Sequence, residues 1–373
     1  VEATIRRGQL MAATGARETV ADMDWYEVRI GPDGPGGWVA AGPDDRWLRL
    51  VDDGAVGFVC EGGCGAASLV SVEPSGDAAI TAIWDEDSWE WTWSPDGTRI
   101  AATFSGGGAV ETAIVVMDAD GSNRRTLGAG YAPAWSPDGS RLAWSTGSTL
   151  VVTDGNLAPT ALDLELRSAG TPMWSPDGAS LAFGAIDCSE CPVDEPIAGD
   201  PPSATWIVGV DGNGLRQLTG GDYSGLVDWS ADGATLLFMQ YDLSGEFPTR
   251  AYTLPVRGGV RAYLEGGGAI TGVPSWSPDG RSLLYATPEA IVVAGRDGGA
   301  PAVVMPAPEA GLESLSWSPG GRWILFGTLA VADGEGPAIR IIAADGGAEP
   351  IQISPSDASA SRAAWQPVLV PLR

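Results

Sequence analysis

Two short acidic segments carry the residue types in this chain that could bind a ligand or do chemistry. In residues 187–195, Cys188 and Cys191 are interspersed with the four acids Asp187, Glu190, Asp194 and Glu195. A second cysteine pair, Cys60 and Cys64, lies far upstream. Two-plus-two cysteine spacings of this kind occur both in structural zinc sites and in small disulfide-bonded loops.

The second acidic segment places a tryptophan on either side of three carboxylates, in the order Trp84, Asp85, Glu86, Asp87 and Trp89. Aromatic rings of this kind can stack on a sugar or on an aromatic group of a partner. Paired carboxylates can hydrolyse glycosides, and carboxylate oxygens suit calcium. No Asp-x-Asp-x-Asp-Gly loop is present, so calcium stays an open alternative, and a solvated acidic surface is the competing interpretation.

The charge balance excludes several classes of function. The 373 residues include 48 acids and 21 basic residues, all of them arginine, and no histidine, which gives a formal charge of −27. Such a chain repels nucleic acid and anionic membrane surfaces. Without histidine, a Ser-His-Asp triad and most zinc catalysis are unavailable. No apolar run reaches the roughly 18 residues that span a membrane.

A five-residue phrase, Trp-Ser-Pro-Asp-Gly, recurs along the chain at intervals of 39 to 55 residues. Its tryptophans, which we expect to be structural, are Trp93, Trp135, Trp174, Trp229, Trp276, Trp317 and Trp365. The phrase departs from this form at Ala231, at Gly320 and at the ending Gln366-Pro367. Proline, aspartate and glycine in this order favour a tight turn, and apolar segments on either side read as strands.

This periodicity predicts an all-β ring of four-stranded units. Six full units run from Trp93 to just before Trp365, and the last copy supplies a single strand. Three further strands lie upstream of Trp93, so a blade shared between both chain ends would close a seven-bladed β-propeller over residues 53–373. Residues 1–52 remain as a separate small β domain.

The repeated phrase resembles the TolB-like, WD40-like propeller repeat of bacteria. The N-terminal phrase Trp25-Tyr26-Glu27-Val28, followed by Gly37-Trp38-Val39, resembles the second half of a bacterial SH3-like domain. The opening strand of that domain, with its Asn-Val-Arg phrase, is not visible here. The resemblance implies a small barrel that either caps the propeller or attaches to cell-wall peptides.

A propeller has two unlike faces. We call the face that carries the Trp-Ser-Pro-Asp-Gly turns the turn face, and the opposite face, with the second-to-third strand connections, the loop face. The connections on the loop face vary in length, and recognition usually lies on irregular loops of a rigid scaffold. We therefore expect any binding site there, with Trp84, Trp89 and the two acidic segments as candidates.

The same ring places the two cysteine pairs almost opposite one another. Shared zinc coordination is therefore disfavoured, and we expect local disulfides Cys60–Cys64 and Cys188–Cys191. Disulfides imply an oxidising compartment, so the chain is expected to be secreted or part of a bacterial cell envelope.

The leading hypothesis is a non-enzymatic binding or scaffold protein with a protein or cell-wall partner. One alternative is a subunit that self-assembles into a surface layer or filament, because an incomplete barrel would leave an open strand edge. A second alternative is an enzyme that acts on carbohydrate through loop carboxylates.

Overall fold

The structure is a computed structural model, and strands make up most of the residues it describes. The described residues are 12–20, 23–29, 36–41, 56–62, 69–72, 81–84, 88–105, 112–162, 164, 166, 168–186, 204–220, 224–241, 249–264, 269–329, 337–347, 349–354 and 358–365. They contain no helix, which confirms the all-β expectation.

Two of the ring sheets begin at the first two repeat phrases. The first contains β7 (Ser88–Trp93), β8 (Arg99–Ser105), β9 (Thr112–Asp118) and β10 (Arg125–Ala129). The second contains β11 (Tyr131–Trp135), β12 (Leu142–Ser145), β13 (Leu150–Thr153) and β14 (Pro159–Ala161). Each sheet is antiparallel and follows chain order, so consecutive strands are hydrogen-bonded neighbours.

The next two sheets follow the same plan with one addition. The third has five strands: β15 (Ser168–Ala169), β16 (Met173–Trp174), β17 (Ser180–Ile186), β18 (Ala204–Gly209) and β19 (Arg216–Gln217). The fourth contains β20 (Ser224–Trp229), β21 (Thr235–Gln240), β22 (Arg250–Pro255) and β23 (Ala262–Tyr263). The strands β15 and β16 both pair with β17, so they act as one interrupted first strand.

Two further sheets complete the run of repeats. One contains β24 (Gly272–Trp276), β25 (Ser282–Ala286), β26 (Ala290–Gly295) and β27 (Ala302–Pro306). The other contains β28 (Leu312–Trp317), β29 (Trp323–Thr328), β30 (Ala338–Ala343) and β31 (Ile351–Gln352).

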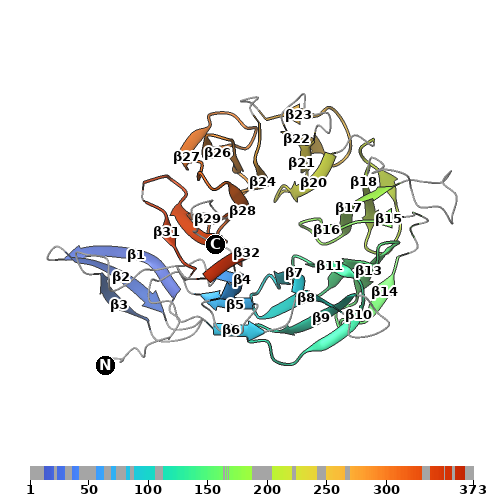
Figure 1. Cartoon of the computed structure of the whole chain (residues 1–373), viewed down its shortest axis with the longest axis horizontal. Coiled ribbons are helices and arrows are strands. Elements are labelled where there is room, and N and C mark those ends of the chain that lie inside the picture. The colour runs from blue at the N-terminus through green and yellow to red at the C-terminus, as the bar shows by residue number, and fades with distance from the viewer. Residues whose placement is uncertain are drawn as a thin grey trace.

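The last sheet is built from both ends of the ring. It contains β32 (Ala358–Trp365), β4 (Val56–Gly62), β5 (Leu69–Val72) and β6 (Thr81–Trp84), in that order. The C-terminal strand β32 pairs antiparallel with β4, from Ala358 opposite Gly62 to Trp365 opposite Val56. This pairing joins segments about 300 residues apart and closes the ring seen in Figure 1.

The sheets stand around a central axis with their first strands innermost (Figure 1). Seven clusters of buried residues lie between them, and each cluster draws its members from two neighbouring sheets. The cluster around Trp84, Trp93, Ile100 and Phe104 completes the circle between the shared sheet and the β7–β10 sheet. Because each middle strand is covered on both faces, strands such as β8 and β29 are apolar runs rather than alternating ones.

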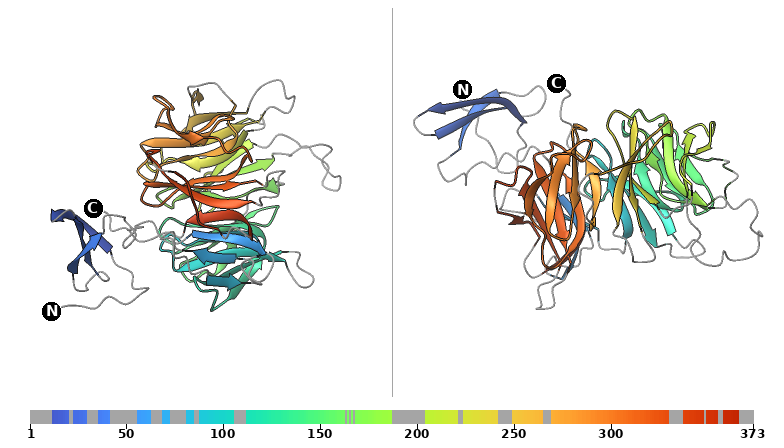
Figure 2. Two further views of the ribbon diagram at one scale, coloured as in Figure 1. Left: turned by 60° about the vertical axis from the view of Figure 1, so that its left-hand side comes forward. Right: turned by 90° about the horizontal axis from the view of Figure 1, so that it is seen from above.

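A separate three-stranded antiparallel sheet precedes the ring. It contains β1 (Ala12–Val20), β2 (Met23–Arg29) and β3 (Gly36–Ala41), with β2 in the middle. Figure 2 draws this sheet outside the ring. The segment that resembles an SH3-like domain thus falls on β2 and β3, while a closed barrel and the boundary at residues 52/53 stay predictions.

Candidate functional site

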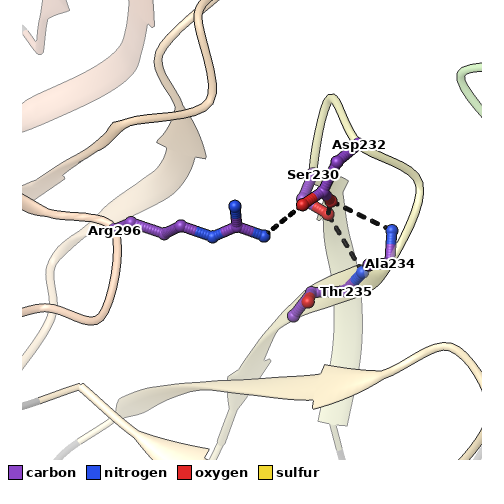
Figure 3. Close-up of polar contacts among 5 residues, drawn as sticks. All are labelled: Ser230, Asp232, Ala234, Thr235 and Arg296. Carbon is purple, nitrogen blue, oxygen red and sulfur yellow. Dashed lines mark hydrogen bonds and ion pairs between the residues drawn. The ribbon is translucent and has the colours of Figure 1, made fainter.

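The repeated turn on the turn face is a closed hydrogen-bond unit, shown for one repeat in Figure 3. The Ser230 hydroxyl donates to Asp232 Oδ1 (2.7 Å), and the same oxygen accepts from the Ala234 N–H (3.0 Å). The Thr235 N–H donates in turn to Ser230 Oγ (2.9 Å). The following glycine, Gly233, has φ of 69°, which is the left-handed region that glycine enters without strain.

The same unit recurs at the other aspartates of the phrase, which are Asp96, Asp138, Asp177 and Asp279. Hydrogen bonds, the largest from the Ser136 hydroxyl, lower the pKa of Asp138 to about 2, and the Ser230 hydroxyl and Arg296 lower that of Asp232 to about 2. These carboxylates are therefore ionised at neutral pH and act as acceptors within their own turns.

Neighbouring turns also pack on one another. A Cβ placed on Gly139 would lie 3.5 Å from Pro95 of the preceding repeat, and one on Gly178 would lie 3.7 Å from Pro137. The same relation links Pro278 to Gly321 and, where the proline is replaced, Ala231 to Gly280. The turn face is therefore a ring of interlocked turns, which suits a structural role.

Arginines reinforce several junctions between sheets. The Arg99 guanidinium lies 4.5 Å from the Trp135 ring centre and donates to the Gly139 carbonyl (2.6 Å) of the next repeat. Arg141 repeats both contacts with Trp174 (4.9 Å) and the Gly178 carbonyl (2.8 Å). At another junction the arginine belongs to the later of the two sheets. Arg296 lies over Trp276 of its own sheet and pairs with Asp232 of the preceding sheet (2.5 Å; Figure 3).

Acidic side chains link innermost strands across three junctions. Glu90 Oε2 in β7 accepts from the Ala132 N–H in β11 (2.7 Å), and Glu313 Oε2 in β28 accepts from the Arg362 N–H in β32 (3.4 Å). Asp228 in β20 accepts from its own neighbour Trp229 and from the Trp276 N–H in β24, both at 2.7 Å. All three acids lie at irregularities in the register of their own strands, and the donors Ala132 and Arg362 lie at irregularities in theirs.

Burial raises the pKa of Asp228 to about 6, against the hydrogen bonds from Trp276 and Trp229, which act in the opposite direction. Burial also raises the pKa of Glu313. Raised carboxyl pKa values are a feature of catalytic acids. Here each carboxylate is engaged with backbone N–H groups, so its contacts are those of a strand-to-strand brace.

Four exposed apolar side chains lie at the loop-face ends of inner or second strands. They are Tyr131, Tyr241, Val273 and Leu329, with exposed fractions of 36%, 45%, 51% and 48%. Tyr241 lies 3.6 Å from a Cβ built on Gly225 near the start of β20, and Leu329 lies 3.4 Å from one built on Gly311, just before β28. Both side chains therefore extend over the beginning of an innermost strand, at the loop-face mouth of the ring.

The structure describes only some of the binding residues that the sequence predicted. The prediction that Trp84 offers a stacking surface is wrong: it is 4% exposed, and its ring packs edge-on against Phe104 at 5.4 Å. The backbone of Trp89 lies in β7 and that of Cys60 in β4, while their side chains lie outside the described part. The other candidates also lie outside the described residues: Asp85, Glu86, Asp87, Asp187, Glu190, Asp194, Glu195, Cys64, Cys188 and Cys191.

The repeat tryptophans pack in the junctions between sheets. Trp93, Trp135, Trp174, Trp229, Trp276 and Trp365 are 6% to 7% exposed, and Trp317 is partly buried. Within the described ranges, no group of three or more His, Cys, Asp or Glu side chains could hold a metal ion. The described residues also include no helix long and apolar enough to cross a membrane.

Sequence reasoning missed the braces Glu90, Asp228 and Glu313 and the four apolar residues of the loop face. The signal for the braces was present, because an acid one to four residues before a repeat tryptophan stands in an otherwise apolar or small-residue strand. No comparable signal marks Tyr131 or Leu329, since single apolar residues at strand ends are common.

Comparison with known proteins agrees with this architecture. The chain resembles TolB from Acinetobacter baumannii at 16% identity, with a TM-score of 0.50 over 94% of this chain and 81% of that chain. It resembles the β-propeller domain of the trilobed protease from Pyrococcus furiosus at 9% identity, with a TM-score of 0.51 over 93% of each chain. No curated protein sequence matches.

A third similar structure, an acylaminoacyl peptidase from Pyrococcus horikoshii, is 14% identical with a TM-score of 0.50. The match covers 69% of this chain and 44% of the peptidase. Structural similarities at sequence identities this low show a shared fold and nothing more. The family model of the TolB β-propeller domain, in contrast, matches residues 98–369 of the sequence itself. With its repeated turns and radial sheets, the chain belongs to the TolB β-propeller domain family.

Proposed function

We propose that this chain is a non-enzymatic binding protein of the bacterial cell envelope or exterior, which holds a protein or cell-wall partner on the loop face of a seven-bladed ring. The observation that carries the proposal is the contrast between the two faces. On the turn face, side chains are used in contacts between repeats. On the loop face, the side chains of Tyr131, Tyr241, Val273 and Leu329 are 36% to 51% exposed.

Exposed tyrosine and aliphatic side chains around the mouth of a rigid ring are the kind of residues that anchor protein interfaces. The acidic segments at residues 85–87 and 187–195 belong to the same face if the repeat register holds through them. They would add a charged rim to an apolar centre, with the disulfides Cys60–Cys64 and Cys188–Cys191 fixing the loops that carry them. This arrangement favours binding over catalysis, because the three acids on the innermost strands, Glu90, Asp228 and Glu313, accept hydrogen bonds from backbone N–H groups.

The self-assembling alternative has one observation in its favour. In the three-stranded sheet β1–β2–β3, the described strands leave β1 and β3 as edges, and open edges can pair with another chain. A homo-oligomer joined through this sheet would keep the ring free, so it is compatible with binding on the loop face.

The proposal is tested by comparing the proteins that immobilised variants retain from a cell-envelope extract. Tyr241→Ser with Leu329→Ser removes two apolar contacts from the loop face. Val303→Ser, at a 66% exposed position on the outer strand β27, is the matched control. We expect a discrete partner that the wild type and Val303→Ser retain and the loop-face variant loses. A partner retained equally by all three would place the binding surface elsewhere.

A further inference from the structure

A cavity of about 510 Å³ lies at the junction between the β11–β14 and β15–β19 sheets. The first sheet lines it with β13, β14 and the turn between them, and the second lines it with the turn at residues 210–213, between β18 and β19. Because antiparallel strands alternate in direction, these turns lie on the turn face, opposite the loop-face residues Tyr241 and Leu329. The volume lies within the range of roughly 300–1,000 Å³ that is usual for small-molecule sites.

One wall of the cavity is apolar. Val152, Leu162 and Val210 all line it, and all three pack in the buried cluster between the two sheets. Thr160 also lines the cavity and is paired with Val152 in the register of β13 and β14, so both side chains lie on the same face of their sheet. A Cβ built on Gly212 would lie 3.9 Å from Leu162 Cδ2, so the turn of one sheet approaches the end of β14 in the other. An aliphatic group of a ligand can therefore be buried between the two sheets.

A guanidinium group contributes positive charge to the lining. Arg141, just before β12, lies 4.9 Å from the centre of the Trp174 ring, and its Nη2 donates to the Gly178 carbonyl at 2.8 Å. That hydrogen bond uses one of the five donors of a guanidinium, whose forked geometry matches a carboxylate. A side chain that is already held in place loses less entropy when it meets an anion. Arg141 is thus prepared to receive a carboxylate of a ligand.

Two carboxylates, one from each sheet, contribute negative charge to the same cavity. Asp154 Oδ1 accepts from the Ala158 N–H (2.9 Å) and the Asn156 N–H (2.8 Å) of its own turn. Asp211 accepts from the Asn213 side-chain amide through Oδ2 (2.9 Å) and from the Asn213 N–H through Oδ1 (3.0 Å). These hydrogen bonds lower the pKa of both carboxyl groups, so both are ionised at neutral pH. Both bonds to Asp154 end on Oδ1, so Oδ2 is the oxygen that can meet an ammonium group.

We infer that this cavity, which we call the junction site, binds a zwitterionic ligand with an aliphatic side chain, of the class of short peptides with free ends. The carboxylates of Asp154 and Asp211 receive the ligand ammonium group, the Arg141 guanidinium receives the ligand carboxylate, and the apolar wall buries the aliphatic side chain. A simple cation would also meet the guanidinium, and a simple anion would also meet the two carboxylates. Charges of both signs around one cavity therefore favour a ligand that carries both.

The inference is tested by isothermal titration calorimetry of the full chain with the dipeptide leucyl-leucine. Asp211→Asn removes one charge of the junction site and keeps a side-chain oxygen that its turn can bond. Asp297→Asn is the matched control, because Asp297 accepts from the Gly299 N–H (3.0 Å) in the corresponding turn of the β24–β27 sheet, away from the cavity. We expect the wild type to bind the dipeptide, Asp211→Asn to weaken binding at least about tenfold, and Asp297→Asn to weaken it less than about twofold.

Two analogues of the dipeptide test the two charges separately. N-acetyl-leucyl-leucine lacks the ammonium group and leucyl-leucinamide lacks the carboxylate, so each should bind at least about tenfold more weakly than leucyl-leucine. A second pair of variants tests the cavity itself. Thr160→Phe fills it from β14 and should abolish binding, whereas Ala161→Phe, on the opposite face of the same strand, should leave binding in place.

The inference is overturned if the wild type does not bind leucyl-leucine at about 10 mM, or if Asp211→Asn and Asp297→Asn bind it equally. It is also overturned if either analogue binds as tightly as the dipeptide, since the site would then not recognise both charges. Should Asp211→Asn fail to fold by circular dichroism, the comparison of Thr160→Phe with Ala161→Phe decides, and equal binding by those two variants contradicts the junction site.

Discussion

At the scale of single residues, the repeat tolerates departures from its phrase, and one of them removes a hydrogen-bond acceptor from its turn. In the β28–β31 sheet, Gly320 stands where the other turns have aspartate. The Ser318 hydroxyl still accepts from the Trp323 N–H (3.0 Å), yet the carboxylate that receives the serine proton in the other turns is missing. A single side chain would restore the full hydrogen-bond unit.

Gly320→Asp is therefore expected to stabilise the protein by about 1 kcal/mol, through a hydrogen bond to Ser318 and through the loss of glycine freedom in the unfolded chain. Gly320 does not have positive φ, so a side chain fits its backbone. Urea denaturation measures the effect. The reverse change at an intact turn, Asp279→Gly, is the control and should cost a similar amount; a Gly320→Asp variant less stable than the wild type would contradict the turn chemistry described here.

Asp228 gives a pH dependence of definite sign. Its pKa is about 6 in the folded chain and about 3.9 when unfolded, so the folded state binds the proton more tightly. The unfolding free energy should therefore fall as the pH rises from about 4 to about 6, by up to about 3 kcal/mol from this group. The turn aspartates, whose pKa values are lowered, act at more acidic pH and in the opposite direction.

Asp228→Asn should remove this slope, which urea midpoints measured at intervals between pH 4 and 7 would show. Glu313→Gln serves as a comparison, because the pKa of Glu313 is also raised and its brace is longer. Equal slopes for the wild type and Asp228→Asn would mean that burial does not raise the pKa of Asp228 in solution.

At the scale of elements, the turns and their order along the chain were predictable, and their packing was not. Proline, aspartate and glycine specify a turn through local backbone preferences, which the sequence displays directly. The contact of Pro95 with Gly139 and the placement of Arg99 over Trp135 depend on how two repeats meet. A repeat read alone carries no information on that geometry.

The same limit explains the error at Trp84. The neighbouring acids indicated an exposed segment, whereas β6 ends at Trp84 directly against the β7–β10 sheet, so the ring is buried beside Phe104. Period-two alternation tells which residues share a face of a strand, but not which face meets the next sheet. The loop-face residues Tyr131 and Leu329 were not predicted, because the exposure of a side chain depends on how the sheets assemble into the ring.

Because the turns pack on one another, a Gly→Ala substitution should cost more stability at one glycine than at another. Gly178 has φ of 66°, and a Cβ there would lie 3.2 Å from Arg141 Nη2 and 3.7 Å from Pro137. Gly155 lacks positive φ and has no atom within 4 Å of a built Cβ. We expect Gly178→Ala to cost about 1–2 kcal/mol and Gly155→Ala to be neutral or slightly stabilising. Thermal denaturation compares the two, and equal effects would contradict the packing of adjacent turns.

At the scale of the whole molecule, closure by β32 binds the two ends of the ring. Trp365 lies eight residues before the end of the sequence and is nevertheless 7% exposed, packed with Val56, Phe58 and Leu325. The last strand of the ring thus contributes a residue to the core.

Trp365→Ala is expected to lower the unfolding free energy by about 3–5 kcal/mol, the usual cost of removing a buried tryptophan. Leu329→Ala, at a 48% exposed position, is the control and should cost less than about 1 kcal/mol. Equilibrium denaturation of the full chain gives both values. A small loss at Trp365 would mean that the C-terminal strand does not close the ring in solution.

The most direct test of the central claim places a photo-crosslinking amino acid at Tyr241 on the loop face and, in a second variant, at Arg281 on the turn face. Both variants are expressed in the organism that encodes the chain and irradiated, and the products are identified by mass spectrometry. The account predicts a discrete crosslinked partner from Tyr241 and none from Arg281. A partner captured at Arg281 and not at Tyr241 would contradict a binding role for the loop face.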